Sequence, residues 1–87
     1  MTSTSLRKDI SLCSSDDGMV ILDERTGRYW QLNITGARIL SGLLAGATPQ
    51  EVSAQLASSH DVTEERASAD VRSLLEQLAG AKIVSVS

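Results

Sequence analysis

Cys13 and His60 are the side chains of this 87-residue sequence that could most readily carry nucleophilic or metal chemistry, and each is the single residue of its type. Cys13 lies in a stretch of alternating apolar and polar residues, where a cysteine commonly packs as a small hydrophobic side chain. His60 lies in a turn between two expected helices, a position typical of solvated residues. One cysteine and one histidine are too few for a closed zinc site.

Two other patterns resemble ligand-binding loops but are incomplete. Asp16-Asp17-Gly18 has the acidic start of a calcium loop, yet the further oxygen ligands of such a loop are missing. The glycines that could form a phosphate-binding loop match no such pattern: Gly27, Gly36, Gly42 and Gly46. Catalysis needs a nucleophile with a base, a carboxylate pair or a metal cluster. We therefore predict no catalytic residue, no metal and no cofactor, and a protein that is not an enzyme.

The elements that would position any site begin with a predicted β-hairpin. The apolar run Met19–Leu22 leads through residues 23–27 into a second extended stretch, Arg28–Leu32. Gly27 stands near the end of the turn, where a positive φ is often needed. Two strand-like runs around such a short turn are typical of an antiparallel pair.

A further strand is predicted ahead of this hairpin. Residues 9–14 alternate between apolar and polar, and residues 15–18 form a turn of Ser, Asp and Gly. The next strand, 19–24, has four apolar residues in succession, which suggests cover on both of its faces. Three strands joined by short turns predict an antiparallel meander in which residues 28–32 form an open edge.

Three helices are predicted after the sheet. Asn33 can cap the first, over residues 35–45, which ends at Gly46. The second opens with Thr48-Pro49-Gln50-Glu51, a capping box with proline at the first helical position. The third, over residues 64–78, carries the clearest apolar stripe and is stopped by Gly80. The expected fold is α+β, a three-stranded antiparallel meander followed by three helices (βββααα), similar to a winged helix-turn-helix.

Composition limits the partners and the compartment. The net charge of −3 and the pI of about 4.9 argue against nucleic-acid and anionic-membrane partners. A single cysteine fits a reducing compartment, and no apolar run approaches the length of a membrane span. The first residues do not form a signal peptide. We expect one domain over residues 1–87, with residues 1–8 flexible, in the cytoplasm.

The outline of a winged helix makes a DNA-binding regulator the alternative function. In that arrangement the third helix would enter the major groove. Its charged residues are Glu64, Glu65, Arg66, Asp70, Arg72 and Glu76, so four acidic residues stand against two basic ones. Since phosphate neutralisation dominates DNA affinity, an acidic recognition helix would oppose binding.

The open edge strand favours peptide binding instead. Exposed strand edges carry unpaired N–H and C=O groups, to which an extended peptide can add as a further strand. Successive strand residues face opposite sides, so Tyr29 and Trp30 cannot both point inwards. If Leu32 faces the helices, Trp30 does too, and Tyr29 is left outside with Gln31.

Three stretches together resemble a known family. They are Val20-Ile21-Leu22-Asp23, Gly27-Arg28-Tyr29-Trp30-Gln31-Leu32-Asn33 and Thr35-Gly36-Ala37-Arg38-Ile39-Leu40. They resemble the PqqD-like precursor recognition elements of ribosomally synthesised, modified peptides (RiPPs), especially the freestanding B1 proteins of lasso-peptide biosynthesis. The resemblance covers roughly residues 9–84, and the last helix of the family is similar to the stretch Asp70 to Leu78.

The resemblance implies a non-catalytic peptide chaperone. Members bind the leader of a precursor peptide, which adds to the third strand and lies against the third helix. Lasso-type leaders usually carry a Tyr-x-x-Pro motif. The peptide-binding residues implied here are Arg28, Tyr29, Trp30, Gln31 and Leu32 on the strand, and Asp70, Val71, Arg72, Leu74, Leu75 and Leu78 on the helix. Because the apolar helix stripe must serve both core and groove, which of its residues face the peptide stays open.

The same resemblance implies further partners. These are a leader protease of the transglutaminase-like B2 type and an ATP-dependent macrolactam synthetase, to which the leader would be presented. Other RiPP pathways, such as PQQ biosynthesis, also use such domains and are the second alternative.

Overall fold

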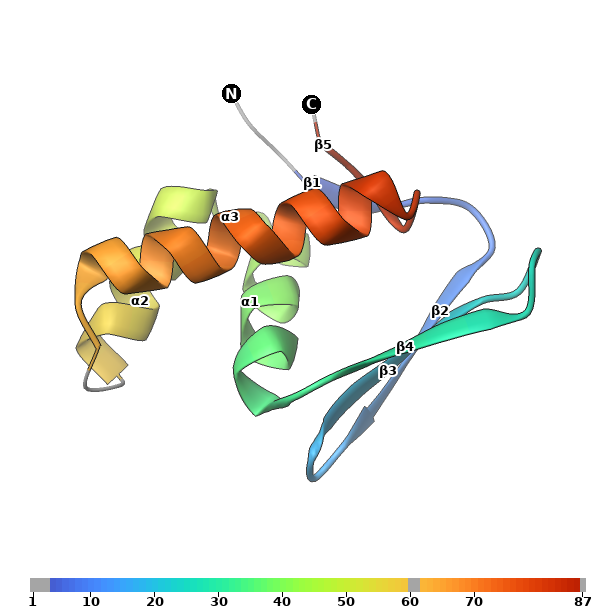
Figure 1. Cartoon of the computed structure of the whole chain (residues 1–87), viewed down its shortest axis with the longest axis horizontal. Helices are drawn as coiled ribbons and strands as arrows, with labels where there is room; N and C mark the ends of the chain where they lie inside the picture. The colour runs from blue at the N-terminus through green and yellow to red at the C-terminus, as the bar shows by residue number, and fades with distance from the viewer. Residues whose placement is uncertain (1–3, 60–61, 87) are drawn as a thin grey trace.

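Three antiparallel strands and three helices follow one another along the chain in this computed structural model, which describes residues 4–59 and 62–86 (Figure 1). The strands are β2 (Ile10–Ser15), β3 (Gly18–Asp23) and β4 (Arg28–Leu32), in the spatial order β2-β3-β4. The helices are α1 (Ile34–Leu44), α2 (Pro49–Ser59) and α3 (Glu64–Gly80). This arrangement confirms the predicted α+β meander with three helices. His60 lies outside the described residues.

A second, smaller sheet joins the two ends of the described chain. β1 (Thr4–Leu6) pairs antiparallel with β5 (Val84–Val86), and the Arg7 N–H donates to the Ile83 carbonyl at 2.9 Å. The expectation of a flexible segment over residues 1–8 is therefore wrong for residues 4–6, while residues 1–3 lie outside the described part. Both strands have only three residues and pair across about 80 positions of the sequence, so no local pattern identifies this pairing.

The two faces of the three-stranded sheet have different surroundings. Ile21 in β3 is fully buried and lies opposite Trp30 of β4, whereas its neighbour Leu22 is 38% exposed and lies opposite Tyr29. Trp30 thus faces the helices and Tyr29 faces outwards, as the alternation predicted. The expectation that β3 is covered on both faces is wrong, because the outer face of the sheet stays open.

Helix α1 is the centre of the core. Leu40 packs with Ile21 and Leu78 in a cluster beneath the sheet, while Leu43 packs in a second cluster with residues of α2 and α3. Figure 1 shows the sheet reaching away from the helices, with α3 crossing α1 and α2. Because both clusters include residues of α1 and α3, the core fixes α3 relative to the sheet.

Side-chain caps set the starts of the helices. The Asn33 Oδ1 accepts from the Gly36 N–H at 2.8 Å, which confirms the predicted cap of α1. At α2 the Thr48 N–H donates to the Glu51 carboxylate at 2.9 Å and the Glu51 N–H to the Thr48 hydroxyl at 3.1 Å, a complete capping box. Hydrogen bonds with Thr48 lower the pKa of the Glu51 carboxyl below its ordinary value; the bond from the backbone N–H has the larger effect and the bond with the hydroxyl the smaller. The ionised Glu51 therefore stabilises the fold fully at pH values above its ordinary pKa. This stabilisation is lost as the pH falls through the lowered pKa.

The end of α3 differs in detail from the prediction. Gly80 is the last helical residue, but the left-handed conformation falls on Lys82, with φ of 62°. The Ile83 N–H donates to the Leu78 carbonyl at 2.9 Å and the Lys82 N–H to the Ala79 carbonyl at 3.1 Å. This is a Schellman motif whose left-handed position is occupied by lysine instead of the usual glycine.

Replacing Lys82 by glycine should therefore stabilise the protein. A left-handed conformation costs an L-residue about 1 kcal/mol or more, and glycine adopts it freely. We expect Lys82→Gly to raise the free energy of unfolding by roughly 0.5–1 kcal/mol, measured by urea denaturation. Lys82→Ala is the control, since it removes the same side chain without relieving the backbone. Equal stability of the two variants would contradict the assignment of strain to this position.

Candidate functional site

The direction of the backbone groups in β4 follows from the ladder on the other side of β3. The Glu24 N–H donates to the Asp9 carbonyl at 2.9 Å, which extends the β2–β3 pairing by one residue pair. Along an antiparallel strand, successive residues direct their N–H and C=O groups alternately to the two neighbouring strands. Glu24 therefore bonds towards β2, and Asp23, Ile21 and Met19 bond towards β4.

Two residues of β4 are left with outward backbone groups. The residues opposite Asp23, Ile21 and Met19 are Arg28, Trp30 and Leu32, and these complete the ladder with β3. The N–H and C=O groups of Tyr29 and Gln31 consequently point away from β3. Among the described strands, β4 pairs with β3 alone. Its other edge thus offers alternating donors and acceptors to an added strand.

A cleft lies between this edge and α3. We call it the β4–α3 cleft; its volume is about 350 Å³ and its lining includes Gln31, Leu32, Thr35, Gly36, Asp70 and Leu74. Asn33 and Ile39 complete the lining, so the first turns of α1 close one end. The structure therefore brings together predicted residues of the strand and of the third helix, 38 or more positions apart in the sequence.

The β4 side chains divide between the core and the surface. Trp30 is half-buried and packs against the core cluster beneath the sheet, and the Arg28 guanidinium lies 5.9 Å from the centre of its ring. This cation–π contact covers part of the indole. Tyr29 is 70% exposed on the outer face of the sheet. Of the five β4 residues predicted as peptide-binding, Gln31 and Leu32 line the cleft itself.

The predicted α3 residues divide in a similar way. Asp70 and Leu74, one turn apart, line the cleft, whereas Val71 and Leu78 are buried in the two core clusters. Leu75 is half-buried and packs against both clusters. Arg72 is exposed and lies about 160° around the helix from Leu74, since each residue turns an α-helix by about 100°. The structure therefore places Asp70 and Leu74 on the cleft, and Val71, Arg72 and Leu78 away from it.

The start of α1 was not among the predicted site residues. Thr35 and Gly36 line the cleft, and a Cβ on Gly36 would lie 3.3 Å from the Leu32 Cβ. A glycine in the first turn of a helix costs stability relative to alanine. Gly36 is therefore the feature of the sequence that could have indicated the close approach of α1 to β4.

The lining of the β4–α3 cleft suits hydrogen bonding and apolar contact with a ligand. Its described lining provides backbone groups, apolar surface and one charged side chain, Asp70, which has no ion-pair partner among the described residues. Within residues 4–59 and 62–86, no group of three His, Cys, Asp or Glu side chains could hold a metal ion. No helix in that part of the chain is long and apolar enough to cross a membrane.

Comparisons with known proteins give the family and the fold of this chain. The family model described as coenzyme PQQ synthesis protein D (PqqD) matches residues 18–84. A solved structure described as lasso peptide synthetase B1 complexed with the leader peptide is 38% identical, with a TM-score of 0.91, over 95% of this chain and 98% of that one. A second, TbiB1 in complex with the TbiA(beta) leader peptide, is 27% identical, with a TM-score of 0.85, over 93% and 94%.

None of the curated proteins matches the chain significantly. The family match includes all of β3, β4 and the three helices, and therefore both walls of the β4–α3 cleft. The chain belongs to the PqqD family, as the resemblance of its strand and helix motifs predicted.

Proposed function

We propose that this protein binds the leader segment of a ribosomally synthesised precursor peptide by adding it as a strand to β4. The observation that carries the proposal is the outward direction of the Tyr29 and Gln31 backbone groups beside a cleft walled by α3. Backbone hydrogen bonds supply affinity in strand addition, and pockets for side chains supply specificity. Leu32 and Leu74 give the cleft apolar walls on both sides.

The leader is that of a lasso peptide. Support comes from two similar structures, both described as B1-type proteins in complex with leader peptides, one of them 38% identical to this chain. A PQQ precursor is the alternative within the family, since the family model takes its description from PQQ synthesis. The proposed role is non-catalytic and cytoplasmic: the protein presents the leader to a B2-type protease and to the macrolactam synthetase. Holding the leader on a shared scaffold would raise its effective concentration at those enzymes.

Fluorescence anisotropy tests the proposal. A labelled leader peptide, from the precursor encoded beside this chain, is titrated with the protein next to a version with its Tyr-x-x-Pro residues replaced by alanine. We expect saturable binding at micromolar concentration or better, lost in the substituted peptide. Equal binding of both peptides would support leader binding but contradict the lasso assignment. Absence of binding to either peptide would contradict the proposed function.

A labelled DNA duplex in the same assay tests the regulator alternative. Helix α3 carries four acidic and two basic residues, so its charge opposes a phosphate backbone. We expect no duplex binding at physiological salt. Salt-sensitive duplex binding tighter than leader binding would favour the DNA-binding function instead.

A further inference from the structure

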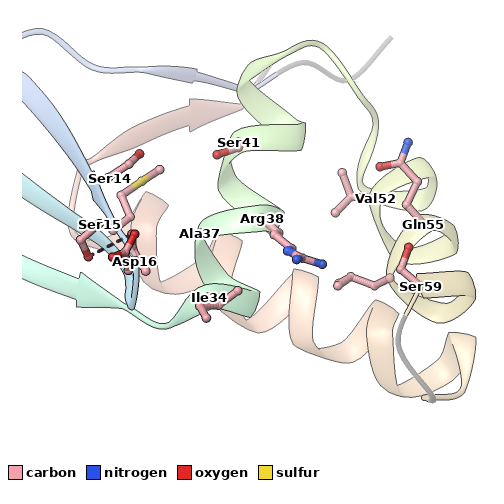
Figure 2. A pocket seen from close by; sticks show the side chains of 13 residues that line it. Ser14, Ser15, Asp16, Ile34, Ala37, Arg38, Ser41, Val52, Gln55 and Ser59 are labelled. Carbon is pink, nitrogen blue, oxygen red and sulfur yellow. Dashed lines mark hydrogen bonds between the residues drawn. The ribbon is translucent and has the colours of Figure 1, made fainter.

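A second cavity lies on the other side of α1 from the β4–α3 cleft. We call it the α1–α2 cavity; its volume is about 580 Å³, it is open to solvent, and residues of the β2–β3 turn, α1 and α2 line it (Figure 2). Its apolar lining includes Met19, Ile34, Ala37, Val52 and Leu56, of which Met19, Val52 and Leu56 are buried. Polar side chains form the rim, among them Gln55 on α2. The cavity thus combines an apolar floor with a polar entrance, the usual composition of a side-chain pocket.

The two sites share the first turns of α1 as their dividing wall. Thr35, Gly36 and Ile39 line the cleft, whereas Ile34 and Ala37 line the cavity. At about 100° per residue, these two sets lie roughly 180° apart around the helix. Ile34 stands on the wall between the two sites and is 48% exposed, although it is a large apolar residue.

An added strand would bring the peptide to this wall. The β2–β3 and β3–β4 pairs are antiparallel, and antiparallel pairing is the more stable kind per residue. A peptide antiparallel to β4 has its N-terminal end beside Leu32, next to the start of α1. Crossing a helix of about 10–12 Å diameter takes three or four extended residues at about 3.3 Å each.

We propose that the α1–α2 cavity binds an apolar side chain of the precursor peptide, three or four residues N-terminal to the segment that adds to β4. An aliphatic or aromatic side chain fits because the floor is formed by Met19, Val52 and Leu56. Figure 2 shows the Arg38 side chain lying between α1 and α2, where its stem adds to the wall of the cavity. The inference rests on the proposed function, since the peptide reaches the cavity from the β4–α3 cleft.

The test combines shortened peptides with a variant that fills the cavity. Leader peptides of the adjacent precursor are trimmed one residue at a time from the N-terminus, down to the shortest whose binding is still weakened by Gln31→Pro. Their affinities are measured for the wild type, Gln55→Trp and Ala54→Trp. Gln55 lines the cavity, whereas its neighbour Ala54 is also exposed on α2 but does not line it. Equal urea midpoints of the two variants verify that both fold.

We expect one step of about tenfold in affinity when the anchoring residue is removed, in the wild type and in Ala54→Trp. Gln55→Trp should bind the full leader only as tightly as the wild type binds the trimmed one, and show no step. No step in the wild type, or an equal step in Gln55→Trp, would overturn the inference while leaving binding at β4 intact. Failure of the wild type to bind any of the peptides would instead overturn the proposed function, and the inference with it.

Discussion

Replacing Gly18 by alanine should destabilise the protein more than any surface substitution of comparable size. Gly18 adopts a φ of 142°, and a Cβ there would overlap the carbonyl oxygen of Leu32 and crowd Asn33. That φ is open to glycine but costs other residues of the order of 1–3 kcal/mol, before any steric overlap is counted. We expect Gly18→Ala to lower the free energy of unfolding by at least about 3 kcal/mol in urea denaturation, a large share of the stability of a small domain.

Gly27→Ala is the matched control for this prediction. Gly27 also has a positive φ, 77°, but a Cβ there meets no atom within 4 Å. Gly27→Ala should lower the free energy of unfolding by only about 1 kcal/mol, because alanine must adopt the left-handed conformation but meets no other atom. Equal losses in the two variants would contradict the close approach of β3 to the end of β4, on which the position of α1 beside the cleft depends.

Gln31→Pro should weaken leader binding 10- to 100-fold without unfolding the protein. The substitution removes an N–H that points away from β3, so the ladder inside the sheet is kept while a donor to the peptide is lost. The partner carbonyl would then be left without its hydrogen bond, which typically costs about 1–3 kcal/mol. Proline also favours extended backbone at the preceding residue, as β4 requires at Trp30. Anisotropy of the labelled leader measures the change.

Ser14→Pro is the control on the opposite edge of the sheet. Ser14 is exposed, and its backbone N–H also points away from β3, because the neighbouring pairs Cys13–Val20 and Ser15–Gly18 belong to the hydrogen-bonded series that includes Asp9–Glu24. Both variants therefore carry the same backbone change. Ser14 lines the α1–α2 cavity, so this comparison uses the leader without the residue proposed to bind there. We expect Ser14→Pro to bind that shortened leader as the wild type does. Equal weakening in both would show that proline disturbs the whole sheet and would remove the support for docking at β4.

Local patterns were sufficient to predict the elements that build the site. Alternation and turn residues predicted β4 at Arg28–Leu32, and the capping residues Asn33 and Thr48 predicted the starts of α1 and α2. The inward direction of Trp30 and the outward direction of Tyr29 followed from strand alternation alone. These features depend on neighbours close in sequence, which is why a single sequence contains them.

Features set by distant contacts could not be predicted in the same way. One apolar stripe on α3 serves both core and cleft, and only the position of α1 and the sheet assigns Val71 and Leu78 to the core and Leu74 to the cleft. The pairing of β1 with β5 joins the two ends of the described chain and has no local signal. The α1–α2 cavity likewise depends on how α2 packs beside the β2–β3 turn.

Amide hydrogen exchange followed by NMR, with and without a saturating leader peptide, tests strand addition at β4 most directly. Strand addition at β4 predicts that exchange at the Tyr29 and Gln31 N–H groups slows strongly on binding, since these groups gain hydrogen bonds to the peptide. Exchange at Leu12, whose N–H group faces the opposite edge and which does not line the α1–α2 cavity, should stay unchanged. If the Tyr29 and Gln31 N–H groups exchange as fast under saturating peptide as in the free protein, strand addition at β4 is contradicted and the peptide binds elsewhere.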